Sequence, residues 1–128
     1  FMIEKKISSD EYTAAILNDK ILPIIKIVPS NEFYDFDAKY KSEETKFLFP
    51  ELSQEMISMI SDQVMKSFNA LGCKTWARVD FFISDDSVIL LEINTIPGMT
   101  DHSLVPKAAS VYGLSYYQLV LEIMGIDA

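Results

Sequence analysis

Short segments rich in apolar residues, separated by clusters of polar turn residues, recur along this chain, a pattern typical of β-strands. They predict strands over residues 2–7, 11–17 and 21–28. Two more strands, over residues 75–83 and 88–94, follow later in the chain. Several strands at such short spacing favour an antiparallel sheet over a repeat of alternating strands and helices.

Apolar residues recur at helical spacing in three other segments. The first is predicted to begin after Ser53 and stop at Gly72, with an apolar stripe of Ile57, Ile60, Val64, Phe68 and Leu71. Shorter helices are predicted from Leu104 to Tyr112 and from Ser115 to Met124, the latter opening with a capping-box pattern. The expected fold is α+β: an antiparallel sheet with helices packed on one face and the other face open to a ligand.

The 128 residues amount to one domain, with enough chain to bury a core. A net charge of −8 without a basic cluster argues against a nucleic-acid partner. The single cysteine, Cys73, excludes an internal disulfide framework and fits a reducing compartment. No apolar run approaches the ~20 residues of a membrane span, and no segment resembles a signal peptide. Because Phe1 opens a segment that already has a strand pattern, we expect the chain to start within a longer protein.

A pair of polar residues, Glu92 and Asn94, follows the apolar run Val88–Leu91. Side chains two residues apart on a strand share a face, and the turn pair Pro97–Gly98 then brings bare backbone close by. Oxygen ligands followed by an exposed glycine amide suit a hard cation that holds phosphate. A Glu-x-Asn pair by itself is more often a solvated strand face, so the neighbouring strand decides between the two interpretations.

The preceding strand carries three further side chains on one face: Arg78, Asp80 and Phe82. A hairpin can place Asp80 opposite Glu92, and Arg78 opposite Asn94, in only one parity of register. A three-residue loop, Asp85–Ser87, gives that parity, whereas a two-residue loop puts the pairs on opposite faces. Like charges this close are tolerable only around a cation or an arginine. We therefore predict that these four residues share one face.

Five segments carry a family resemblance: EKKISSDEYTAAIL from Glu4, FYDFDAKY from Phe33, RVD from Arg78, LEINTIPGMT from Leu91 and HSLVPKAA from His102. In this order and spacing they strongly resemble the C-terminal segment of D-alanine–D-alanine ligases, members of the ATP-grasp superfamily. The resemblance covers essentially all 128 residues. It implies that residues 1–128 form the C-terminal ATP-grasp domain, with the N-terminal domain and part of the central domain absent from this chain.

The resemblance implies that ATP binds against the first strands of this domain. Backbone groups in a hinge segment would read the adenine edge, and a carboxylate would meet the ribose. The matching nucleotide-binding residues are Glu4, Lys5, Ile7, Glu11, Phe33, Lys39, Phe82 and Leu91. By pattern alone, an exposed hairpin explains the hinge segment better, and two core aromatics explain Phe33 and Phe82 about as well. Leu91 would need a bulge to reach the side of Glu92.

The resemblance also implies a metal and a substrate site. Asp80, Glu92 and Asn94 match ligands of Mg²⁺ or Mn²⁺, with two ions expected. The remaining matches are Arg78 and the Gly98 amide for the oxyanion of the tetrahedral intermediate, Tyr40 for the first D-alanine, and Ser103 and Leu104 for the second. His102, the single histidine, is better explained as an exposed loop residue than as a base.

The implied activity is ATP-dependent ligation of two D-alanine molecules through an acyl phosphate, for peptidoglycan synthesis in the cytoplasm. The implied partners are D-alanine and ATP, without nucleic acid or membrane, and the full-length enzyme is expected to be a homodimer. This chain alone is expected to be inactive. Two alternatives remain open: another ATP-grasp carboxylate–amine ligase, and a non-catalytic nucleotide-binding module.

Overall fold

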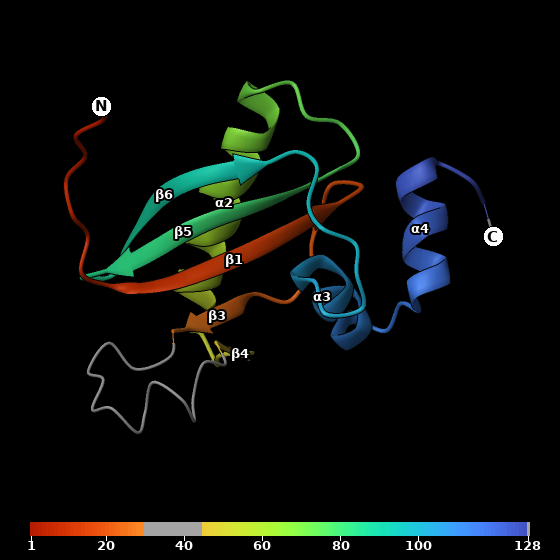
Figure 1. Cartoon of the computed structure of the whole chain (residues 1–128), viewed down its shortest axis with the longest axis horizontal. Helices are drawn as coiled ribbons and strands as arrows, with labels where there is room; N and C mark the ends of the chain where they lie inside the picture. Colours follow the sequence, from red (N-terminus) through yellow and green to blue (C-terminus); the bar gives the residue numbers. More distant parts are fainter. Residues whose placement is uncertain (30–44, 128) are drawn as a thin grey trace.

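The structure, a computed structural model, describes residues 1–29 and 45–127 and is built around one antiparallel sheet (Figure 1). The strands are β1 (Asp10–Leu17), β2 (Lys20–Ile21), β3 (Ile25–Val28), β4 (Lys46–Leu48), β5 (Trp76–Ser84) and β6 (Ser87–Asn94). Their order is β4-β3-β1-β5-β6, with the short β2 paired to β1. The long strands β1, β5 and β6 lie side by side, with β6 at one edge of the sheet.

Two tight turns join neighbouring strands, and both use residues with positive φ. Asn18 and Asp19 have φ of 48° and 64°, and Asp85 and Asp86 have φ of 49° and 59°. Asn and Asp tolerate this left-handed region, which matches a two-residue turn to the twist of a hairpin. The loop between β5 and β6 is therefore Asp85–Asp86, since Ser84 already pairs with Ser87. The expectation of a three-residue loop was wrong.

A β-bulge in β6 restores the register that the shorter loop would have reversed. From the turn, pairing runs regularly as far as Phe81 opposite Leu90, and the next pair is Asp80 opposite Glu92. Leu91 is thus one extra residue on β6. An extra residue exchanges the two faces of the strand beyond it. Asp80 therefore faces Glu92 as predicted, although for a different reason.

Helix α2 (Gln54–Ala70) covers one face of the sheet, and its ends follow local sequence signals. The Ser53 side chain caps it by accepting a hydrogen bond from the Met56 amide at 3.1 Å. Its buried side chains pack against alternate residues of the central strands in one core: Ile60, Val64 and Phe68 with Tyr12, Ala14, Ile16, Ala77, Val79 and Phe81. The predicted stripe was wrong at its ends, because Ile57 and Leu71 are exposed, at 37% and 66%.

Helices α3 (Leu104–Tyr112) and α4 (Tyr116–Met124) lie at one end of the opposite face (Figure 1). Their buried residues form a second core with the end of β1 and the start of β3: Ala15, Leu17, Leu22, Ile25, Val105, Ala108, Ala109 and Leu119. The capping box at Ser115 and Gln118 is present as predicted. The helices were expected on one face of the sheet, but only α2 covers that face, and α3 and α4 pack at one end of the other. Most of that other face remains open for the candidate site.

Two predicted strands differ from the structure. Residues 2–7 form no strand and residues 1–6 are exposed, because no strand in the described part of the chain lies beside them to complete a hydrogen-bond ladder. The strand expected over residues 21–28 is interrupted between β2 and β3, where Pro23 has no amide hydrogen to donate. Among the helices of the described residues, none has the length and apolarity required to cross a membrane.

Candidate functional site

The sheet face opposite α2 gathers polar side chains from three neighbouring strands. In the register of β1 and β5, Glu11 lies opposite Phe82 and Thr13 lies opposite Asp80. Asp80 also pairs with Glu92 on β6, which confirms the predicted register. The residues on this face are Glu11 and Thr13 of β1, Arg78, Asp80 and Phe82 of β5, and Glu92 and Asn94 of β6.

Arg78 and Asp80 form a bidentate ion pair at the centre of this face. Arg78 Nε donates to Asp80 Oδ1 at 3.1 Å, and Nη2 donates to Oδ2 at 3.1 Å. The Asp80 side chain is only 6% exposed and that of Arg78 is 20% exposed. A guanidinium has five N–H donors, so three remain for another acceptor. The pair therefore holds Arg78 in a fixed orientation with donors to spare.

Thr13 is a residue of this face that the sequence interpretation missed. Its side chain is buried, and its hydroxyl lies 2.7 Å from Asp80 Oδ1. The available signal was its position two residues after Glu11, which puts the two on one face of β1. A threonine in an otherwise apolar strand is also an ordinary core residue, so only the register reveals its partner.

Asp80, Glu92 and Asn94 supply oxygen donors of the type that Mg²⁺ and Mn²⁺ prefer. Asn94 Oδ1 accepts a hydrogen bond from the Ile96 amide at 3.1 Å and keeps a second lone pair. Within residues 1–29 and 45–127, no three His, Cys, Asp or Glu side chains form a group that could hold an ion. With Asp80 and Glu92, the further protein donor in this predicted set is the Asn94 amide oxygen. Mg²⁺ often uses only one or two carboxylates together with water and substrate phosphate, so this set fits it.

The carboxylate of Glu11 reports on the electrostatics of this face. Burial raises its pKa above the ordinary value of 4.5, and the negative charges of Asp80 and Glu92 add to the effect. The Arg78 guanidinium acts in the opposite direction without cancelling it. The face therefore has an excess of negative charge, which a bound cation would relieve.

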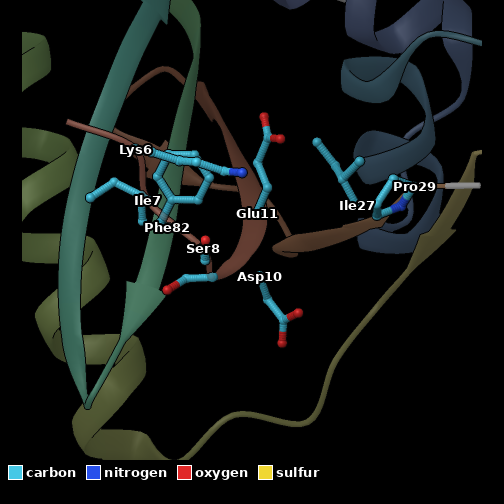
Figure 2. A pocket seen from close by; sticks show the side chains of 9 residues that line it. Lys6, Ile7, Ser8, Asp10, Glu11, Ile27, Pro29 and Phe82 are labelled. Atoms are coloured by element: carbon cyan, nitrogen blue, oxygen red, sulfur yellow. The ribbon is translucent and has the colours of Figure 1, made fainter. Parts of the chain in front are cut away.

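A pocket of about 560 Å³ lies next to this face, where the N-terminal arm meets β1 and β3 (Figure 2). Ile7, Glu11 and Phe82, all singled out from the sequence, line it, and Figure 2 shows Glu11 and Phe82 pointing into the same space. Glu4 and Lys5 lie in the exposed arm outside the lining, while Lys6 contributes to it. The full lining is Lys6, Ile7, Ser8, Ser9, Asp10, Glu11, Ile27, Pro29 and Phe82.

The loop after β6 brings Gly98 against the start of α3. A Cβ on Gly98 would lie 3.0 Å from Ser103 Oγ, so a larger residue would push Ser103 away. Ser103 is the N-cap of α3 but does not use its side chain as a cap. Its Oγ instead accepts the Thr100 amide hydrogen at 3.0 Å. Gly98, Ser103 and Leu104, the first residue of α3, are thus brought together at the end of β6.

Four other predicted site residues have different outcomes. Phe33, Lys39 and Tyr40 lie outside the described residues. Leu91 is the extra residue of the β6 bulge and is 46% exposed. The bulge is the irregularity that a position for Leu91 on the side of Glu92 would require. His102 is 89% exposed in its side chain, in keeping with a loop residue.

Residues 1–125 match the family described as D-ala D-ala ligase C-terminus. The chain belongs to the D-alanine–D-alanine ligase family. Its structure resembles a D-alanine–D-alanine ligase from Bacillus anthracis, with 38% identity and a TM-score of 0.84 over 95% of this chain. A structure of that organism's ligase complexed with ATP matches with 34% identity and a TM-score of 0.81, again over 95% of this chain.

A D-Ala:D-Ser ligase, VanG from Enterococcus faecalis, matches with 29% identity and a TM-score of 0.77 over 95% of this chain. The antiparallel sheet and the three helices of the described residues are those of the C-terminal ATP-grasp domain of D-alanine–D-alanine ligases. The chain spans only 40%, 39% and 37% of the lengths of these three relatives. The family is thereby established, and the chain corresponds to only part of each of these ligases.

Proposed function

We propose that residues 1–128 are the C-terminal ATP-grasp domain of a ligase that joins two D-alanine molecules to D-alanyl-D-alanine at the expense of ATP. The N-terminal domain and part of the central domain would lie outside this chain. The observation that carries the proposal is the shared face of Arg78, Asp80, Glu92 and Asn94 beside the pocket lined by Glu11. We refer below to the longer protein implied by this proposal as the intact ligase.

The pocket beside β1 is the proposed nucleotide site, and a relative solved with ATP supports this assignment. Backbone groups of Lys5 and Ile7, in the hinge that begins at Glu4, would meet the adenine edge. Glu11 would accept hydrogen bonds from the ribose hydroxyls, as a charged acceptor does well. The apolar and phosphate contacts are assigned to Phe82 and Leu91, with Phe33 and Lys39 from the segment outside the described residues.

Asp80, Glu92 and Asn94 are the residues that would hold Mg²⁺ or Mn²⁺, two ions in the full site. When bound, the metal would neutralise charge on the phosphates of ATP. Among the described residues of this face, one arginine faces three carboxylates, those of Glu11, Asp80 and Glu92. Without a cation, that excess of negative charge would repel a triphosphate.

The carboxylate of the first D-alanine would attack the γ-phosphorus of ATP and release ADP. The amine of the second would then attack the resulting acyl phosphate and release phosphate. Arg78, which keeps three N–H donors beyond its pair with Asp80, and the Gly98 amide would stabilise the oxyanion of that second step. Tyr40 would orient the first D-alanine. Ser103 and Leu104 would contact the second, with Ser103 binding its carboxylate.

The dipeptide would serve peptidoglycan synthesis in the cytoplasm, with the intact ligase acting as a homodimer. The direct test is ADP release by the intact ligase with D-alanine, with product identification by mass spectrometry. D-alanyl-D-alanine formation that requires ATP and a divalent cation is the expected result. ATP hydrolysis without dipeptide, or a product lacking D-alanine, would contradict the proposal.

A second candidate differs in the amine acceptor. It is supported by one similar structure, at a TM-score of 0.77, which is that of a D-Ala:D-Ser ligase. Competition between D-alanine and D-serine in the same assay separates the two candidates. A product ratio that favours D-alanyl-D-serine at equal acceptor concentrations would replace the first candidate by the second.

A further inference from the structure

The carboxylate of Asp80 is held from two strands. Arg78, on its own strand β5, donates to both oxygens at 3.1 Å. Thr13, on the neighbouring strand β1, places its hydroxyl 2.7 Å from Oδ1. This is the shortest of the three contacts, in the range of a strong O–H···O⁻ hydrogen bond. Since β6 lies on the other side of β5, Thr13 approaches Asp80 from the side away from Glu92 and Asn94.

The three contacts leave the two oxygens of Asp80 unequal. An ionised carboxylate has about two acceptor positions on each oxygen. Oδ1 accepts from both Thr13 and Arg78 Nε, whereas Oδ2 accepts only from Arg78 Nη2. Oδ2 is therefore the oxygen with an acceptor position still free for a cation.

Among the described residues, the Thr13 hydroxyl has one other acceptor in reach, the Val79 carbonyl at 3.3 Å. Thr13 is 2% exposed and Asp80 is 4% exposed, so water has little access to replace a lost hydrogen bond. A charged acceptor at 2.7 Å is favoured over a neutral one at 3.3 Å. The hydroxyl proton is thus directed at Asp80.

We propose that Thr13 is a positioning residue of the metal site, which fixes the Asp80 carboxylate so that Oδ2 is presented to the cation. Thr13 itself contacts no substrate and no ion; it acts through Asp80. The inference rests on the proposed function, because it takes Asp80 to be a metal ligand. The predicted ligands lie on β5 and β6, and Thr13 adds support from a further strand, β1.

The test compares Thr13→Val, which exchanges the hydroxyl for a methyl group of similar volume, with Thr13→Ser, which keeps the hydroxyl. Mn²⁺ affinity of the intact ligase is measured by electron paramagnetic resonance in the presence of ATP. We expect Thr13→Val to weaken Mn²⁺ binding by about 10–100-fold, as removal of an outer-shell partner does, and Thr13→Ser to bind nearly as the parent. If Thr13→Val does not fold, Thr13→Ala against Thr13→Ser gives the same comparison.

Thr75→Val is the matched control, since it makes the same chemical change just before β5, away from the polar face. It should leave Mn²⁺ affinity unchanged even where it alters the unfolding free energy. Equal Mn²⁺ affinity for Thr13→Val and the parent would overturn the role of Thr13. That result is separable from failure of the proposed metal site, which would appear as Mn²⁺ affinity unchanged by Asp80→Asn and Glu92→Gln.

Discussion

Arg78 sets the charge balance of the polar face, because its guanidinium donates hydrogen bonds to both oxygens of Asp80. One bidentate pair neutralises one carboxylate, and Glu11 and Glu92 remain on the same face. The raised pKa of Glu11 is the consequence for the nearest group. Individual residues here thus have properties that follow from their neighbours in the sheet and not from their own sequence context.

Glu92→Gln in the intact ligase should weaken the response to Mg²⁺ much more than it alters stability. The change removes a charged donor while keeping size, and Glu92 is exposed, so the unfolding free energy should move by no more than about 0.5 kcal/mol. Turnover at limiting Mg²⁺ should fall by at least the ~10–100-fold typical of lost outer-shell partners. Glu51→Gln, an exposed change away from the sheet face, is the control. An unaltered Mg²⁺ dependence would exclude Glu92 as a ligand.

Glu11→Gln should stabilise the fold at neutral pH and have no such effect in acid. A carboxyl whose folded pKa lies above its unfolded value binds more protons when folded, so its contribution to stability falls as the pH rises from 4.5 through the folded pKa. Below 4.5 both variants are neutral at this position and should unfold alike. Urea unfolding of both proteins across this range measures the difference. A gain from Glu11→Gln that is constant with pH would contradict the electrostatic explanation.

The element with the largest effect on the site is β6, because its bulge sets which side chains meet β5. The two-residue turn at Asp85–Asp86 would by itself place Glu92 and Asp80 on opposite faces of the hairpin. The extra residue Leu91 exchanges the faces of β6 again, so Glu92 lies opposite Asp80. A regular strand after the same turn would have placed Leu91 opposite Asp80. The site therefore depends on two local irregularities that compensate each other.

The buried stripe of α2 gives a direct test of which predicted helix residues form the core. Phe68→Ala should lower the unfolding free energy by about 3–5 kcal/mol, because Phe68 is 1% exposed between the helix and the sheet. Leu71→Ala is the control from the same predicted stripe, and at 66% exposure it should change the unfolding free energy by less than about 0.5 kcal/mol. Urea denaturation of both variants provides the comparison, and similar losses would contradict the observed packing.

Helix ends were the best predicted features, because caps are encoded by a few adjacent residues. Ser53, the Ser115–Gln118 capping box and Gly113 and Gly125 lie where the pattern places them. The loop between β5 and β6 was not predictable in the same way, since Ser-Asp-Asp-Ser fits turns of either length. Its length and the bulge are decided jointly by burial of the strand faces, a property of the whole sheet.

The candidate site could be predicted residue by residue only where a family resemblance or strand parity applied. Strand parity placed Glu92 and Asn94 on one face, but their meeting with Asp80 was predicted from a loop length that is wrong, and the bulge restores it. Thr13 escaped notice because its partner is 67 residues away and is reached only through the pairing of β1 with β5. Long-range pairings of this kind leave no local trace in a single sequence.

At the scale of the whole molecule, the two hydrophobic cores cover one face of the sheet and one end of the other face, and the candidate site occupies the remainder. The core with α2 supports the back of the central strands, and the core with α3 and α4 secures one end of the front. The residues that line the pocket come from the other end, where the N-terminal arm leads into β1. Figure 1 shows this arm at the end of the sheet away from α3 and α4. The strands of the polar face are therefore packed against α2 on their other side, and within the described residues the polar face itself is open.

The purified 128-residue chain should show no ligase turnover and only weak nucleotide binding. The chain spans 40% of the Bacillus anthracis ligase that it resembles, so much of the surface that would enclose two substrates lies elsewhere in the intact ligase. Holding two reactants in place can lower a barrier by ~7–11 kcal/mol, and no single side chain of the polar face replaces that contribution. A triphosphate would also meet a chain of net charge −8 with few cations near the pocket. Phosphate release is measured with ATP and D-alanine, together and separately, with the intact ligase as the positive control. Release by the chain that requires both substrates would show that the polar face and pocket suffice for the reaction.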